Sequence, residues 1–346
     1  MNVYEIDPTT DQRWEDFLQR HPQASIFHTR GWLEALRNTY DYTPVAFTTS
    51  APERPLTNGI PFCKIAGFFD KRRLVSLPFS DHCQPLVQTS EQFKCLTAYL
   101  HRKRGLEKWD YVEMRPLNSM LPNGRGFDNS QSFFFHRLNL RRGLDEIFQN
   151  FHKDCVQRKI RRAEREGLDY EEGITDSLLN QFYRLLLLTR RRHGLPIQPV
   201  SWFRNLIAHL GANLTLRVAS KDGQPIAGIL TLRYKQSLVY KYGCSDQRFN
   251  ALGGMQLLFW RAIQQAKQDQ LCEFDLGRSD TDNPGLVAFK DRWGAAQSNL
   301  VYFRCGTKYS QRLTKAHQAA ISKYLWSHAP TTMLTAAGRA LYRHLG

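Results

Sequence analysis

Several patterns that define common protein classes are missing from this chain of 346 residues. Its seven cysteines include no Cys-x-x-Cys pair, and an odd, unpatterned set favours reduced thiols over a disulfide framework or a zinc site. The longest aliphatic run, Leu185 to Leu188, is far shorter than the roughly 20 apolar residues of a membrane-spanning helix. The first residues have neither the basic nor the apolar region of a signal peptide. The sequence therefore predicts a soluble, cytoplasmic protein without a metal site.

Acidic residues are missing altogether after Asp291, although the whole chain has a net charge of +16. Half of that excess lies in this last stretch, on Arg292, Arg304, Lys308, Arg312, Lys315, Lys323, Arg339 and Arg343. A field of this sign attracts a polyanion such as tRNA, a nucleotide diphosphate, CoA or an anionic membrane face. The alternative is a generally basic protein whose charge only keeps it in solution.

What the chain does contain is apolar residues, 42% of the total, in alternating strand and helix patterns. That content suffices for two hydrophobic cores. Strands are expected at 44–48, 59–66, 73–77 and 109–114, and again at 214–219, 225–234, 237–243 and 272–276, with helices between them. We therefore expect an α/β (α+β) protein with domains at residues 1–150 and 151–306 and a basic amphipathic helical tail at 307–346.

The most informative segment runs from Phe274 to Ala295. A short apolar strand ends in Asp-Leu-Gly-Arg-Ser, a loop rich in Asp, Asn, Pro and Gly follows, and Phe289 and Lys290 come next on an amphipathic turn. Strand ends that feed polar loops are where α/β proteins place chemistry. A lysine there is either a fixed positive charge for a phosphate or a developing oxyanion, or a solvated surface residue.

This segment resembles the C-terminal signature of the FemAB/FemX-like transferases. Four other segments are similar to that family in the same order: His21 to His28 with Trp32 and Leu33, Leu77 to Leu86, Arg158 to Leu168, and Tyr242 to Ser245. The resemblance implies two tandem GNAT-like acyltransferase domains, each a mixed twisted sheet flanked by helices, with the acceptor side in the first and the donor and catalytic side in the second. It implies an N-acyltransferase that moves an acyl or aminoacyl group to an amine of a cell-envelope, peptidoglycan or polysaccharide precursor. The donor co-substrate would be acyl-CoA or aminoacyl-tRNA, without a tightly bound cofactor.

The sequence has no Gly-x-Ser-x-Gly elbow for a covalent intermediate, so we expect the amine to attack the donor directly. Lys290 would stabilise the oxyanion or a nearby phosphate, and Phe289 would wall the donor pocket. Asp81 is a candidate for holding the acceptor ammonium and Asp275 for placing the loop, although either could be a turn or helix cap. His82 is assigned to acceptor or phosphate binding; it could serve as a base or be a bystander.

The remaining candidates would bind the donor or its phosphates. Tyr242 and Gly243 match the family's strand end, and Arg248, Gly253 and Gly254 lie where a phosphate loop is expected, with two extra residues before the first glycine. Adjacent glycines that open a helix either present backbone N–H groups to a phosphate or only make a tight turn. Arg158, Arg161 and Arg162, with Arg278, could hold a diphosphate, or form a solvated surface.

Two alternatives stay open. The basic tail helix, expected at 308–326, either lies on an anionic membrane face or docks on the core. The whole chain could also be a non-catalytic tRNA/RNA- or nucleotide-binding protein with a degenerate acyltransferase fold. The Phe289-Lys290 pair argues against the second alternative, because a pure binding protein has no need of one lysine at that position.

Overall fold

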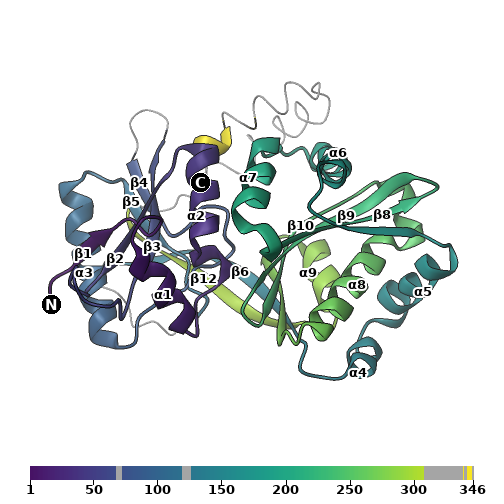
Figure 1. Ribbon diagram of the computed structural model, residues 1–346, viewed down its shortest axis with the longest axis horizontal. Coiled ribbons are helices and arrows are strands. Elements are labelled where there is room, and N and C mark those ends of the chain that lie inside the picture. The colour runs from purple at the N-terminus through teal and green to yellow at the C-terminus, as the bar shows by residue number, and fades with distance from the viewer. Residues whose placement is uncertain (68–71, 119–125, 308–337, 339–340, 345–346) are drawn as a thin grey trace.

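The computed structural model describes residues 1–67, 72–118, 126–307, 338 and 341–344. Within these residues, twelve strands form one sheet in the order β1-β2-β3-β4-β5-β12-β6-β11-β10-β9-β8-β7. Figure 1 shows this sheet running through two lobes, one built mainly from the first half of the chain and one mainly from the second. The lobes are therefore joined by sheet hydrogen bonds as well as by side-chain packing.

The first half begins with β1 (Tyr4–Ile6) and continues with the strands β2 (Thr43–Thr48), β3 (Ile60–Ala66), β4 (Arg72–Val75) and β5 (Tyr111–Met114). Its helices are α1 (Gln12–Arg20), α2 (Arg30–Tyr40) and α3 (Ser90–Leu106). Local sequence explains their starts, because the Thr29 hydroxyl caps α2 by accepting from Trp32 N and Thr89 forms a capping box with Gln92 on α3. The helix predicted at 31–39 and the strands predicted from 44 to 114 are present, each within a few residues.

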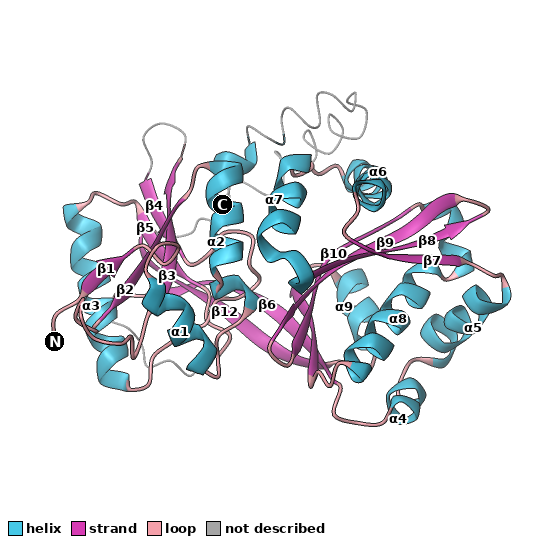
Figure 2. Cartoon of the chain, in the orientation of Figure 1, coloured by secondary structure: helices cyan, strands magenta, loops and turns pink. Residues whose placement is uncertain are grey.

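The second half contains the strands β7 (Asp169–Gly173), β8 (Leu214–Lys221), β9 (Gln224–Tyr234), β10 (Ser237–Ser245) and β11 (Glu273–Asp280). Its helices are α4 (Leu144–Gln149), α5 (Arg158–Arg165), α6 (Asp176–His193), α7 (Val200–Leu210), α8 (Gly254–Gln268) and α9 (Pro284–Asp291). Helices α5, α8 and α9 lie on one side of this part of the sheet, and α6 and α7 on the other (Figure 2).

Two further strands, β6 (Asp128–Asn139) and β12 (Ala296–Gly306), join the halves by exchange. Strand β6 follows β5 in the chain but pairs with β11, whereas β12 follows β11 but pairs with β5. The two strands also pair antiparallel with each other. The sequence did not predict either strand.

Helices α2 and α7 close the junction from one side. Trp32 of α2 meets Trp202 of α7 edge-to-face at 5.3 Å between ring centroids, and both belong to one buried cluster that draws on both halves. Gly31 makes this approach possible, because a Cβ at that position would lie 2.4 Å from the His209 backbone oxygen. Polar side chains held between the two halves are therefore fixed by packing on both sides.

Candidate active site

The parallel strands β10 and β11 pair over only part of their length, and ligands of open α/β sheets bind outside the carboxyl ends of such strands. They pair only from Ser237 to Val239 against Glu273 to Asp275. Beyond that point the β11 register shifts, and Gly277 takes a φ of +73°. A Cβ at Gly277 would lie 2.4 Å from an Asp81 carboxylate oxygen, so this glycine lets the loop of the first half approach the separated strands.

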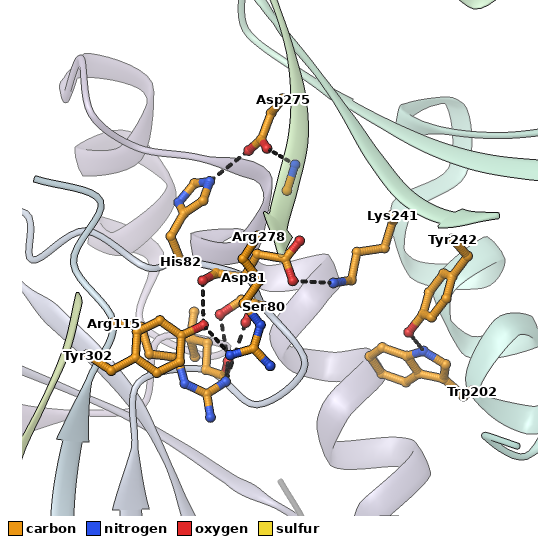
Figure 3. Close-up of polar contacts among 12 residues, drawn as sticks. Ser80, Asp81, His82, Arg115, Trp202, Lys241, Tyr242, Asp275, Arg278 and Tyr302 are labelled. Atoms are coloured by element: carbon orange, nitrogen blue, oxygen red, sulfur yellow. Dashed lines mark hydrogen bonds and ion pairs between the residues drawn. The ribbon is translucent and has the colours of Figure 1, made fainter. Parts of the chain in front are cut away.

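Asp275 joins the halves at the last paired position. One of its carboxylate oxygens lies 2.8 Å from His82 Nε2, and the other accepts a 2.7 Å hydrogen bond from the Gly277 backbone N–H. Both side chains are buried. Asp275 therefore fixes the start of the Gly277 bend and the orientation of the His82 ring at once (Figure 3).

Asp81 lies beside this pair and faces Lys241, whose ammonium is 3.4 Å from its carboxylate. The Tyr302 hydroxyl donates a 2.5 Å hydrogen bond to the Asp81 backbone oxygen. Burial acts to raise the pKa of Asp81, but the positive charges of Lys241, Arg278 and Lys290 offset it and leave that pKa below its ordinary value. Asp81 is therefore a stable anion in a positive environment.

Lys290 lies on α9 and is 2% exposed. Its ammonium donates to the backbone oxygens of Gly277 and Arg278, at 2.9 and 2.7 Å. Burial lowers the pKa of Lys290 to about 8, although Asp81 and Asp275 act to raise it. The lysine therefore anchors the bend of β11 and places a titratable positive charge beneath it.

A polar cavity of about 320 Å³ surrounds the Asp81 side, and we call it the Asp81 cavity. Its lining residues come from both halves and from the C-terminal segment: Phe79, Ser80, Asp81, Arg115, Arg190, Gln198, Lys241, Tyr242, Arg278 and Tyr342. Four of them are cations and one is a carboxylate, so the cavity suits a ligand that combines an anionic group with an ammonium.

A second cavity of about 310 Å³, the Gly243 cavity, lies toward α8 and α9. It is lined by Gly243, Gly254 and Phe289 from the predicted donor set, with Lys159, Arg192 and Tyr240 among the others. Gly243 is required there because a Cβ would lie 1.9 Å from the Tyr240 hydroxyl oxygen. The N-terminus of α8, which begins at Gly254, also reaches this cavity and favours a negative group.

Tyr242 does not line the Gly243 cavity, because successive residues of β10, such as Tyr242 and Gly243, face opposite sides of the sheet. It lines the Asp81 cavity, and its hydroxyl oxygen accepts from Trp202 Nε1 at 2.9 Å. A third cavity, of about 670 Å³, has His82 and Asp275 in its lining. The His82–Asp275 pair is thus separate from the lining of the Asp81 cavity.

The structure brings only some of the predicted phosphate contacts to a cavity. Arg278 lines the Asp81 cavity, and its guanidinium lies 4.2 Å from the centroid of the Phe133 ring. Arg248 is largely exposed and pairs with Asp246 at 2.6 Å. Four other residues predicted to contact the donor or its phosphates line none of the three cavities: Arg158, Arg161, Arg162 and Gly253. Gly253 has a φ of +82°, and a Cβ at this position would lie 2.3 Å from the Lys159 backbone oxygen. This glycine therefore lets the chain pass close to the Lys159 backbone.

Other residues of the site have no signal in the sequence. Lys241, Arg115 and Tyr302 come from three different strands or strand ends, and only the fold places them around Asp81. Arg115 also binds Glu113 at 2.9 Å, and Glu113 is bound in turn by Arg304 at 2.5 Å. Lys159, next to the predicted Arg158, is the residue of α5 that lines the Gly243 cavity. Among the described residues, no group of three or more His, Cys, Asp and Glu side chains could hold a metal ion.

A family model for the GNAT acetyltransferase domain matches residues 151–291, which span the Gly243 cavity and the separated strands. A UDP-N-acetylmuramoylpentapeptide-lysine N(6)-alanyltransferase of Weissella viridescens is 25% identical over 304 residues, covering 82% of this chain and 89% of the relative. These two similarities confirm that the chain is an acyltransferase with a GNAT domain. The Weissella relative, together with the FemX structure described next, also confirms the resemblance to the FemX-like transferases.

Solved structures confirm the predicted fold. The crystal structure of FemX is similar with a TM-score of 0.71 and 14% identity, covering 91% of this chain and 99% of that one. A tandem GNAT protein from the clavulanic acid biosynthesis pathway is similar with a TM-score of 0.55 and 10% identity, covering 90% and 99%. The predicted tail helix at 308–326 lies outside the described residues. No helix within the described ranges has the length and apolar character needed to cross a membrane.

Proposed function

We propose that this FemX-like acyltransferase moves an aminoacyl group from an activated donor to a primary amine of a peptidoglycan or related envelope precursor. The observation that carries the proposal is the Asp81 carboxylate, paired with Lys241 inside a cationic cavity, at the place where β10 and β11 separate. The Weissella relative, named for alanyl transfer to a lysine of a UDP-linked pentapeptide, supports both the reaction and the kind of acceptor.

The acceptor would occupy the Asp81 cavity. Asp81 attracts its ammonium, while Arg115, Arg190 and Arg278 attract its anionic part, such as a diphosphate. The low pKa of Asp81 suits it to hold a cation and makes it a weak base. The attacking species is therefore the small neutral fraction of the amine, held at the right position.

The donor would occupy the Gly243 cavity and present its carbonyl between the separated strands. The amine nitrogen forms a bond to the carbonyl carbon, and the bond from that carbon to the departing oxygen or sulfur breaks. The N–H proton lost by the amine balances the proton gained by the leaving group. Lys290 holds the Gly277 and Arg278 backbone and supplies positive charge as the carbonyl oxygen becomes anionic.

The decisive experiment is transfer of radiolabelled alanine from alanyl-tRNA to UDP-N-acetylmuramoylpentapeptide, with the product identified by mass spectrometry. Asp81→Asn removes the anion that attracts the ammonium, so we expect acceptor affinity to fall roughly thirtyfold, which corresponds to about 2 kcal/mol. Arg248→Ala is the control because Arg248 is largely exposed and lines none of the three cavities described above. Equal activity of Asp81→Asn and the wild type would overturn the assignment.

The donor's chemical class is tested separately, because the GNAT similarity favours an acyl-CoA as second candidate. Lys159 lines the Gly243 cavity, whereas Arg158, next to it on α5, pairs with Asp154 at 2.9 Å on the surface. We expect Lys159→Glu to raise the donor KM roughly tenfold or more and Arg158→Glu to change it little, because a single cation at a phosphate is worth on the order of 1–2 kcal/mol. Transfer from acetyl-CoA but not from alanyl-tRNA would show that the donor is an acyl-CoA and not an aminoacyl-tRNA.

A further inference from the structure

The end of the chain returns to the junction between the halves. Residues 341–344 are helical and lie beside α2 (Figure 1). On the side of the first half, the Tyr42 hydroxyl donates a 2.6 Å hydrogen bond to the Tyr342 backbone oxygen, and Arg343 pairs with Asp41 at 2.7 Å. These contacts attach the segment to the turn that follows α2.

The same segment also contacts the second half. The Tyr342 hydroxyl donates a 3.0 Å hydrogen bond to the Pro196 backbone oxygen, in the connection between α6 and α7. Gly338 packs against the next residue of that connection, where a Cβ would lie 1.9 Å from the Ile197 backbone oxygen. The segment therefore bridges both halves above the Asp81 cavity, and Tyr342 lines that cavity.

The Tyr342 ring completes a group of aromatic side chains at the cavity. It meets Phe79 edge-to-face at 5.7 Å, and Phe79 in turn meets Trp202 at 5.7 Å. Phe79 has a φ of +61°, a left-handed conformation that is strained for a bulky residue and persists only where the surroundings impose it. Packing among these rings therefore holds Phe79 and Tyr342 in the cavity lining.

We propose that Tyr342 is a specificity-determining residue of the Asp81 cavity, which the C-terminal segment completes. Phe79, Tyr242 and Tyr342 form an aromatic wall in a cavity that also contains Arg115 and Arg278. Such a combination fits an acceptor with a sugar or aliphatic peptide face beside its anionic group. The inference rests on the proposed function, since it assigns this cavity to the acceptor, and it extends the acceptor site to residues 341–344, which follow β12 in the chain.

Steady-state kinetics on three full-length variants tests the proposal, with UDP-N-acetylmuramoylpentapeptide as acceptor. Tyr342→Ala removes the ring, Tyr342→Phe keeps the ring but loses the hydrogen bond to Pro196, and Arg343→Ala alters the same segment at an exposed ion pair. We expect Tyr342→Ala to raise the acceptor KM about tenfold, equivalent to about 1.4 kcal/mol, with kcat and the donor KM within about twofold. Tyr342→Phe, which keeps the ring, should recover most of the acceptor affinity lost in Tyr342→Ala, and Arg343→Ala should stay close to the wild type.

Three results would overturn the inference: an unchanged acceptor KM in Tyr342→Ala, an equal effect of Tyr342→Phe, or a loss confined to kcat and thermal stability. The last two would make the tyrosine a structural contact between the halves. Asp81→Asn, measured alongside, separates this failure from failure of the proposed function. If Asp81→Asn loses acceptor affinity while Tyr342→Ala does not, the proposed function stands and only the role assigned to Tyr342 is wrong.

Discussion

Burial of Lys290 has a direct consequence for its charge. The side chain is almost fully buried, and its pKa of about 8 lies close to neutral pH. A lysine in this state loses its charge just above the physiological range, so any step that needs the ammonium must become slower there. Lys290 holds the Gly277 backbone, and under the proposed function the transfer step is the one that needs its charge.

We predict that turnover per neutral acceptor amine, that is, the rate with saturating substrates divided by the neutral fraction of the amine at each pH, falls as pH rises through about 8 in the wild-type protein. Lys290→Arg keeps its charge at that pH and should lack the fall, although its planar group fits less well and its maximum rate is lower. Lys290→Met should be slower by roughly a hundredfold at neutral pH, as expected for loss of one oxyanion-stabilising group. Pre-steady-state transfer measured from pH 6 to 10 checks all three.

Unfolding cannot account for the predicted loss of activity, because the sign is opposite. The pKa of Lys290 is lower in the folded state, so its ammonium costs stability below about pH 8, and that cost disappears as pH rises toward the unfolded value of 10.5. Over this window the lysine favours folding while activity declines. An identical alkaline limb in the wild type and Lys290→Arg would show that another group titrates.

At the scale of elements, the site depends on the separation of β10 from β11, and Gly277 is its most constrained position. Its φ of +73° disfavours any side chain, and a Cβ would press on the Asp81 carboxylate. Gly105 in α3 is a contrasting glycine, because a Cβ added there would have no other atom within 4 Å outside its own helical turn.

We predict that Gly277→Ala destabilises the protein by about 1–3 kcal/mol and raises the acceptor KM, because Asp81 has to move. Gly105→Ala, in the last turn of α3, should instead stabilise by at most about 0.5–1 kcal/mol, the gain from replacing glycine in helical backbone, and leave kinetics unchanged. Denaturant unfolding together with acceptor KM values would test the pair. Wild-type kinetics in Gly277→Ala would mean that Asp81 does not contact the acceptor.

The sequence predicted the helices and strands whose positions follow from local apolar periodicity and turn residues. It did not predict the strands whose positions depend on pairing with a distant strand. The capped helices and the strand ending in Asp275 follow from apolar periodicity and turn residues. Strands β6 and β12 were missed, because each pairs with a strand from the other half and no local signal records such an exchange. For the same reason the sequence pointed to Asp81 and Lys290 but not to Lys241, which only the fold brings to Asp81.

For the whole molecule, the exchanged strands bear on where the domains divide. We propose that the predicted boundary near residue 150 still separates acceptor and donor sides, with β6 and β12 crossing between them. Glu113 of β5 and Arg304 of β12 pair at 2.5 Å across that exchange. The pKa of Glu113 is low because Arg115 and Arg304 outweigh the effect of burial, so this contact favours folding above the ordinary carboxylate pKa. The stabilisation from this ion pair is lost as pH falls through the lowered pKa of Glu113.

The basic stretch after Asp291 raises a separate question at this scale, whether the protein contacts an anionic membrane, where lipid-linked acceptors would be found. The contacts of residues 338 and 341–344 attach the end of the chain to the core and complete the Asp81 cavity. Deleting the whole tail would therefore confuse membrane binding with damage to that cavity. Charge reversal within the full-length chain avoids this problem.

We predict that the wild-type protein sediments with vesicles containing anionic phosphatidylglycerol, and that replacing Lys308, Arg312, Lys315 and Lys323 by Glu abolishes this. Each basic residue near such a surface contributes about 1 kcal/mol, so four reversals remove most of the attraction. Transfer to the soluble acceptor UDP-N-acetylmuramoylpentapeptide should be unchanged, because Tyr342 and Gly338 are untouched. Raising the salt concentration should release the wild-type protein from vesicles, since exposed charges are screened beyond about 10 Å at 0.1 M. Equal sedimentation of both proteins, or none with the wild type, would show that the tail charge serves another anion, such as the donor.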